Sequence, residues 1–278
     1  MKRAIYLVVL YFLYQFLFAF LVMVGAVAID IAKNGGEAAL SSTNIASYSS
    51  DTNWLSIAMI LAGVAMLVHL FKGHYISIPE QVTAFLNKEK SGLVLLLCIP
   101  FIYVVMYLLN VVSEAIDLPN LLEDTFLDMS GNVWGILSIT LVAPVLEECL
   151  FRGAIEGHLL KKMKPWAAIL ISALLFGIVH MNPAQVVYAS LIGIVLGWLY
   201  WRSGSVLPSI VAHVLNNTIA VIGMRYYDSE GIESFEELAG EQAQPIIWAA
   251  YAGLAILLFL VLRKIFNSQC NLSEPSNV

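Results

Sequence analysis

Two adjacent carboxylates interrupt an apolar stretch near the middle of the chain. Glu147 and Glu148 lie in the run from 133 to 154, and Arg152 follows Glu148 by four residues. Ionisable side chains inside an apolar span cost about 2.5–3.5 kcal/mol each on insertion scales, and they are therefore candidates for function. Glu148 and Arg152 share a helix face in the orientation that favours an ion pair, although such a pair would equally suit an interfacial anchor. Glu147 has no local cation and needs a partner from another helix.

Two histidines lie in later apolar runs. His180 ends the run that starts at 169, one turn after Phe176, and His213 lies in the run 206–223. Asn217 follows His213 by four residues, so both side chains project from one helix face. Histidine can transfer protons or bind a metal, and an asparagine amide can donate to a developing oxyanion. These residue types favour hydrolysis, although an isolated interfacial histidine would look the same as His180.

Two mechanisms are open for such a set. A carboxylate in a low-dielectric cavity can serve as general base to a water molecule, and this version requires no cofactor. Alternatively, Glu147, His180 and His213 could be three ligands of a divalent metal such as Zn²⁺, whose bound water attacks. The His-Glu-x-x-His spacing of soluble zinc peptidases is absent, and we favour the metal-free version. Pro144 frees a backbone carbonyl one turn earlier and predicts a kink beside the acids.

The elements that position these residues are predicted to be membrane helices. The chain of 278 residues is 60% hydrophobic and 12% charged, whereas soluble domains have roughly 45–50% apolar and about 25% charged residues. Nothing in this composition favours nucleic acid as a partner. We expect an all-α polytopic membrane protein forming a single domain over 1–278, with about eight transmembrane helices. Their approximate ranges are 4–29, 54–71, 93–112, 133–154, 166–180, 184–201, 206–223 and 245–262.

Charge distribution predicts the orientation of these helices. Placing the N-terminus in the cytoplasm puts the basic residues of the connecting segments inside, except Lys33 and Arg225. With eight crossings, the C-terminus is also cytoplasmic. Acidic residues gather in the outer segments 114–128 and 228–241, which we interpret as solvated surface. An uncleaved first helix is preferred to a signal peptide at 1–28, because its apolar stretch exceeds the roughly 7–15 residues of a signal sequence.

The run that contains His180 is short for a full crossing, and only residues 181–183 separate it from the next run. At about 1.5 Å per residue, Glu147 and His213 lie roughly 10 Å from the cytoplasmic ends of their spans, but His180 lies roughly 21 Å from its own. We therefore expect a short buried hairpin at 166–201. Either its tip lies inside the protein or its first helix begins below the membrane surface, so that His180 comes level with Glu147.

Three motifs follow one another in separate apolar runs: Glu-Glu-x-x-x-Arg at 147–152, Phe-x-x-x-His at 176–180 and His-x-x-x-Asn at 213–217. Together they resemble the CPBP family, the CAAX-protease and bacteriocin-processing enzymes also called the Abi family. The resemblance covers about 145–220 and shows no departure at the motif positions. It implies an α-helical intramembrane endopeptidase with a catalytic core of four helices at 133–223.

The resemblance also implies roles for individual residues. Glu147 with His180 would activate a water molecule, and His213 with Asn217 would stabilise the oxyanion. Glu148 and Arg152 would be supporting residues that orient Glu147. Phe176 would be the third supporting residue. The substrate would be a membrane-associated, membrane-embedded or lipidated peptide or protein, with a prenylated CAAX protein as the eukaryotic example and a peptide pheromone or bacteriocin precursor as bacterial ones.

Other functions remain as alternatives to this hypothesis. A non-catalytic bacteriocin-immunity or membrane-binding protein would keep the motifs and bind a partner instead. A proton-coupled transporter would also use buried carboxylates and a broken hairpin, but we find no internal repeat to support it. The short loops favour a bacterial plasma-membrane protein in contact with the lipid bilayer.

Overall fold

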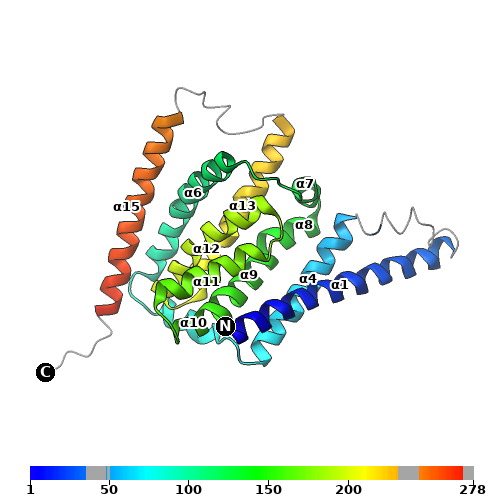
Figure 1. The fold of residues 1–278 in the computed structure, drawn as a ribbon, viewed down its shortest axis with the longest axis horizontal. Helices are drawn as coiled ribbons and strands as arrows, with labels where there is room; N and C mark the ends of the chain where they lie inside the picture. The colour runs from blue at the N-terminus through cyan, green and yellow to red at the C-terminus, as the bar shows by residue number, and fades with distance from the viewer. Residues whose placement is uncertain (36–47, 49–50, 231–243, 272–278) are drawn as a thin grey trace.

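The fold consists of helices throughout the residues that a computed structural model describes, namely 1–35, 48, 51–230 and 244–271. Figure 1 shows a bundle with α1 and α15 at its opposite edges. In chain order the elements are α1 (Lys2–Asn34), α4 (Thr52–Lys72), α5 (Ile78–Leu86), α6 (Ser91–Ile116), α7 (Glu123–Ser130), α8 (Val133–Leu137), the π-helix η1 (Ser138–Val142), α9 (Ala143–Glu147), the π-helix η2 (Glu148–Glu156), α10 (Gly157–Leu160), α11 (Pro165–Ile178), α12 (Pro183–Ser203), α13 (Val206–Glu230) and α15 (Gln244–Asn271).

Seven helices in the described part of the chain are long and apolar enough to cross a membrane. One of them is the continuous helix Val133–Leu160, which comprises α8, η1, α9, η2 and α10. The protein is therefore an all-α polytopic membrane protein, as the sequence predicts. The remaining predicted span, 166–180, is an apolar helix of 14 residues, Pro165–Ile178, and is shorter than the other seven.

Contacts between segments far apart in the sequence define one end of the bundle. Arg3 donates to the Tyr75 carbonyl at 3.0 Å, and Lys88 donates to the Ser203 carbonyl at 2.7 Å. Arg202 also contacts Asn267 near the end of α15. These contacts bring the basic segments together, as the predicted alternation of crossings requires, whereas their cytoplasmic location stays a prediction. Much of the first connecting loop and of the second acidic segment, at 36–47, 49–50 and 231–243, lies outside the described residues.

α11 and α12 form a close antiparallel hairpin, and each begins with a proline at its first position, where the missing N–H is not needed. Small residues allow the two helices to approach. A Cβ added to Gly177 would lie 2.0 Å from Oγ of Ser190, and one added to Gly193 would lie 3.2 Å from Cβ of Ala173. Close approach at small residues is a common way to pack membrane helices. The hairpin predicted at 166–201 therefore forms.

The turn of this hairpin is tied to the segment before α7. The side chain of Asn182 is fully buried, accepts from the Leu121 N–H at 3.0 Å, and donates to Oδ1 of Asn120 at 2.7 Å. The neighbouring Met181 is 73% exposed and has a φ of 53°. Within this turn the protein buries Asn182 but leaves Met181 exposed. The tip of the hairpin is therefore buried only in part.

Candidate active site

The two glutamates lie where the helix Val133–Leu160 changes its hydrogen-bonding pattern. Glu147 is the last residue of α9, and Glu148 is the first residue of the π-helix η2. The π-helical turn is wider than an α-helical turn, and such stretches are frequent at functional sites. Glu147 is 9% exposed and Glu148 is fully buried. The adjacent acids therefore have different environments, as expected from their different directions on a helix.

Pro144 and the π-helix η1 together leave one backbone carbonyl open. The N–H of Ala143 donates to the carbonyl of Ser138, and Pro144 has no N–H, so neither supplies a donor to the carbonyl of Ile139. The side-chain amide of Asn217 supplies it instead, with Nδ2 at 2.8 Å from the Ile139 oxygen. The carbonyl freed beside the acids is therefore an acceptor for a predicted site residue.

The predicted ion pair between Glu148 and Arg152 forms in the interior. Nη1 of Arg152 lies 3.1 Å from Oε1 of Glu148, and both side chains are fully buried. The guanidinium also donates to the carbonyl of Gly193 at 3.2 Å and lies 4.4 Å above the ring of Phe176. Because neither charge reaches solvent, the pair is not an interfacial anchor. It connects η2 to both helices of the hairpin.

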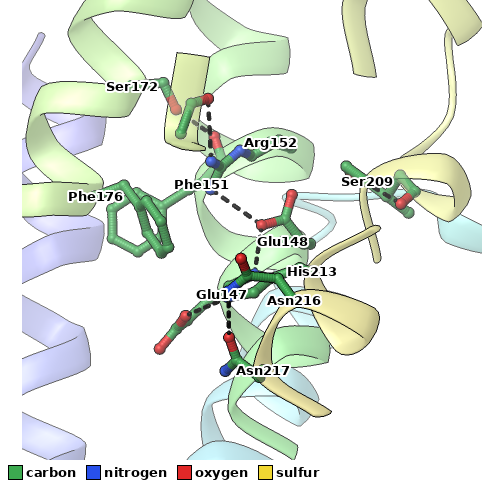
Figure 2. A network of polar contacts seen from close by, with 12 residues as sticks. Glu147, Glu148, Phe151, Arg152, Ser172, Phe176, Ser209, His213, Asn216 and Asn217 are labelled. Carbon is green, nitrogen blue, oxygen red and sulfur yellow. Dashed lines mark hydrogen bonds and ion pairs between the residues drawn. The ribbon is translucent and has the colours of Figure 1, made fainter. Parts of the chain in front are cut away.

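His213 lies between the two carboxylates. Its Nδ1 is 2.9 Å from Oε1 of Glu148, and its Nε2 is 3.7 Å from Oε2 of Glu147. Figure 2 shows this set side by side, with Arg152 on the far side of Glu148. The partner that Glu147 needs from another helix is therefore His213, on α13. The carboxylate of Glu148 contacts His213, which in turn faces Glu147, and the prediction that Glu148 orients Glu147 stays a prediction.

Phe176 packs against both His180 and His213. Its ring is perpendicular to both imidazoles, with centroids 4.9 Å from His180 and 5.6 Å from His213. Nδ1 of His180 lies 2.8 Å from the Phe176 carbonyl. A carbonyl oxygen only accepts, so Nδ1 carries the hydrogen and Nε2 of the neutral ring has a free lone pair. No hydrogen bond or ion pair joins His180 to Glu147 within the described ranges.

The described residues include no group of three or more His, Cys, Asp or Glu side chains that could hold a metal ion. Nδ1 of His180 is engaged by the Phe176 carbonyl and Nδ1 of His213 by Glu148, so the Nε2 atoms of the two rings are the ones left for chemistry. A metal-ligating histidine is commonly held by such a hydrogen bond at its other nitrogen, so these contacts suit either version of the mechanism. The metal-free version favoured from the sequence stays a prediction.

Two buried polar residues, Glu156 and Asn216, were not predicted from the sequence. Both oxygens of Glu156 are buried with no hydrogen-bond partner in the part of the chain that the structure describes. A Cβ on Gly197 would lie 2.6 Å from Oε2 of Glu156, so only glycine leaves room for this carboxylate. Its spacing of four residues after Arg152 was a visible signal. Asn216 is 5% exposed and donates to Oδ1 of Asn217 at 3.0 Å, a contact that sequence spacing does not reveal.

Comparison with known proteins finds similarity in the segment that carries this site. Residues 129–219 match the model described as "Type II CAAX prenyl endopeptidase Rce1-like". This segment is thus similar to the family that the three motifs resemble. The matched range closely follows the predicted core, 133–223, and contains all seven residues of the three motifs.

A curated relative with a similar segment comes from Bacillus subtilis (strain 168) and carries the name "Putative membrane peptidase YdiL". It is 34% identical over 112 residues, which are 40% of this chain and 44% of the relative. The similar part thus spans less than half of either protein. No solved structure matches the chain.

Proposed function

We propose that this protein is an intramembrane endopeptidase that hydrolyses a peptide bond with a water molecule activated by Glu147 and His180. The observation that carries the proposal is the buried line of polar contacts from Glu147 through His213 and Glu148 to Arg152. Buried ionisable groups in a membrane span are costly, and here they converge from two helices on one partly open carboxylate. The family match and the relative's printed name support the same reaction class.

The first proposed step is proton removal from water. The side chain of Glu147 is 12% exposed, so water can reach it, whereas the side chain of Glu148 is closed off. Glu147 takes a proton from the water as general base, and the free lone pair of His180 Nε2 accepts a hydrogen bond from the same molecule. The hydroxide oxygen then bonds to the carbonyl carbon of the scissile peptide, whose π electrons move to its oxygen.

The second proposed step is stabilisation and collapse of the tetrahedral intermediate. One amide hydrogen of Asn217 is bound by Ile139, and the other is free to donate to the oxyanion. Nε2 of His213 faces the same carboxylate as the water and donates to the oxyanion when it carries a proton. Collapse breaks the C–N bond, and the proton held by Glu147 passes to the leaving amine. Glu148 and Arg152 hold His213 in place throughout.

The proposed substrate is a membrane-associated peptide, with a lipidated C-terminus as the first class to test. The seven long apolar helices of the described chain, which include the helices of Glu147 and His213, support a substrate that approaches from or along the bilayer. The matching family model is described by its action on CAAX prenyl proteins, and this substrate is carried to the present chain as a proposal.

The test is cleavage of quenched fluorescent peptides by purified protein in proteoliposomes. One peptide ends in a farnesylated CAAX sequence, and a matched peptide lacks the lipid. Glu147→Gln is expected to lower kcat by about 10²–10⁴-fold, the range typical of a general base, with the fold retained. Glu89→Gln is the control, because Glu89 is exposed and lies at the basic end of the bundle.

Three results bear on the proposal differently. Loss of cleavage in Glu147→Gln but not in Glu89→Gln supports hydrolysis at this site. Equal cleavage by both variants overturns the catalytic assignment of Glu147. Binding of the peptide without cleavage by any form overturns the peptidase and favours the non-catalytic binding protein.

A further inference from the structure

A chain of hydrogen bonds ends at the amide of Asn217. The hydroxyl of Tyr188 on α12 donates to Oδ1 of Asn216 at 2.7 Å. Nδ2 of Asn216 then donates to Oδ1 of Asn217 at 3.0 Å, and Nδ2 of Asn217 donates to the Ile139 carbonyl at 2.8 Å. These hydrogen bonds thus connect α12 through α13 to η1. They lie close to His213, which is one helical turn before Asn217 on α13.

The carbonyl of Ile139 determines the direction in which these hydrogen bonds are donated. Its carbonyl can only accept, and it receives no backbone donor from Ala143 or Pro144, as described above. A side-chain amide can rotate by half a turn and exchange its oxygen with its nitrogen. If Asn217 did so, its Oδ1 would face the Ile139 carbonyl, and two acceptors would meet. The acceptor freed by Pro144 therefore selects the orientation in which Asn217 donates.

The Tyr188 end is joined in the matching direction. Its hydroxyl donates to Oδ1 of Asn216, and Nδ2 of Asn216 donates to Oδ1 of Asn217. A tyrosine hydroxyl can both donate and accept, so the Ile139 carbonyl selects the direction and the Tyr188 hydrogen bond holds Asn216 in it. The second amide hydrogen of Asn217 is then available in a defined direction.

We propose that Tyr188 and Asn216 are positioning residues that hold the Asn217 amide in the orientation selected by the Ile139 carbonyl and keep it ready to donate to the oxyanion. This inference rests on the proposed function for its catalytic consequence. The hydrogen-bond polarity itself does not depend on the reaction. Neither residue belongs to the three motifs, and neither needs to touch the substrate.

The first test is a double-mutant cycle. Tyr188→Phe removes one hydroxyl and is expected to lower kcat by about fivefold, corresponding to one hydrogen bond, with KM nearly unchanged. If Tyr188 acts through Asn217, the same substitution has no further effect in an Asn217→Ala background. Tyr6→Phe, at an exposed position on α1, is the control and should behave as wild type in both backgrounds.

Asn216→Asp tests the direction of the chain with a residue of nearly the same shape. A carboxylate cannot donate to Oδ1 of Asn217, so Asn217 is expected to rotate and present its nitrogen to residue 216. We expect a larger loss of kcat than in Tyr188→Phe. Wild-type kcat in Asn216→Asp would overturn the proposal.

The second test observes the ¹⁵N signal of the Asn217 side-chain amide. In protein labelled with ¹⁵N-asparagine, the side-chain signal of Asn217 is assigned by its loss in Asn217→Ala. Tyr188→Phe is expected to shift this signal, and Tyr6→Phe is not. An unmoved signal, or an equal kinetic loss in both backgrounds of the cycle, overturns the positioning role. If wild-type protein shows no hydrolysis that depends on Glu147, the proposed function fails, while the spectroscopic result still decides the polarity.

Discussion

His213 turns its Nδ1 toward Glu148, 2.9 Å away, and its Nε2 toward Glu147, 3.7 Å away. Glu148, the sequence neighbour of Glu147, is therefore hydrogen-bonded to the histidine that faces Glu147. The two acids differ in environment, because one is closed inside the protein and hydrogen-bonded, while the other retains some exposure. The Glu-Glu pair thus consists of two different groups, a closed carboxylate between His213 and Arg152 and a partly exposed carboxylate, for which we propose the catalytic role.

Glu148→Gln is expected to destabilise the protein by about 3–5 kcal/mol, because it leaves the buried charge of Arg152 without its partner. Thermal unfolding in detergent measures the loss. The double variant Glu148→Gln/Arg152→Gln should lose less than the sum of the single variants, because it removes both charges. Additive losses would contradict the coupling between these two side chains. Glu89→Gln serves again as the exposed control.

Asn182→Ala is expected to loosen the turn that follows His180. The substitution leaves the Leu121 N–H and the Asn120 side chain without their partner, at a cost of about 1–3 kcal/mol in unfolding free energy. We expect kcat to fall while KM changes little, because His180 loses its fixed position. Asn182→Asp retains an acceptor for Leu121 and should recover part of the loss. Unchanged kcat in Asn182→Ala would show that the turn does not position His180.

Alanine substitutions at three glycines should have graded effects on stability. Gly177→Ala is expected to be the most harmful, because the new Cβ would meet Ser190 at 2.0 Å and the Val186 backbone oxygen at 2.5 Å. Gly193→Ala should cost less, since its nearest contacts at 3.2 Å require only a small shift. Gly92→Ala has open space and is the neutral control. Apparent melting temperatures in detergent measure the series, and a reversed order would contradict the close hairpin packing.

Exhaustive chelation is expected to leave peptide cleavage unchanged. The reason is that the described residues do not form a cluster of three or more possible ligands. The measurement is kcat/KM after dialysis against chelator, with residual metal determined in the same sample. Loss of activity that Zn²⁺ restores would contradict the metal-free mechanism and return Glu147, His180 and His213 to consideration as ligands.

The sequence predicted the membrane class and the pairing of Glu148 with Arg152 because those signals are local, whereas the burial of the pair came from the structure. Apolar runs of sufficient length specify spanning helices, and a spacing of four residues places Glu148 beside Arg152 on one turn. The hairpin at 166–201 was also predictable, since a short run and a proline-containing turn leave few alternatives. The catalytic roles of the motif residues came from family resemblance and stay predictions.

The contacts between helices were decided only by the tertiary structure. Sequence spacing does not specify that His213 meets Glu148 at closer range than Glu147, or that Phe176 joins both histidines. Such contacts depend on the rotation and separation of packed helices, which small residues such as Gly177 and Gly193 set from outside the motifs.

The acids Glu147 and Glu148 show this division most clearly. Their adjacency, their apolar surroundings and the ion pair with Arg152 are properties of one helix, and the sequence by itself determined them. Their separation into a closed, hydrogen-bonded group and a partly exposed group was decided by the packing of α13, because His213 approaches from another part of the chain. A single helix fixes only directions around its own axis, whereas packing fixes which direction faces a partner and which faces water.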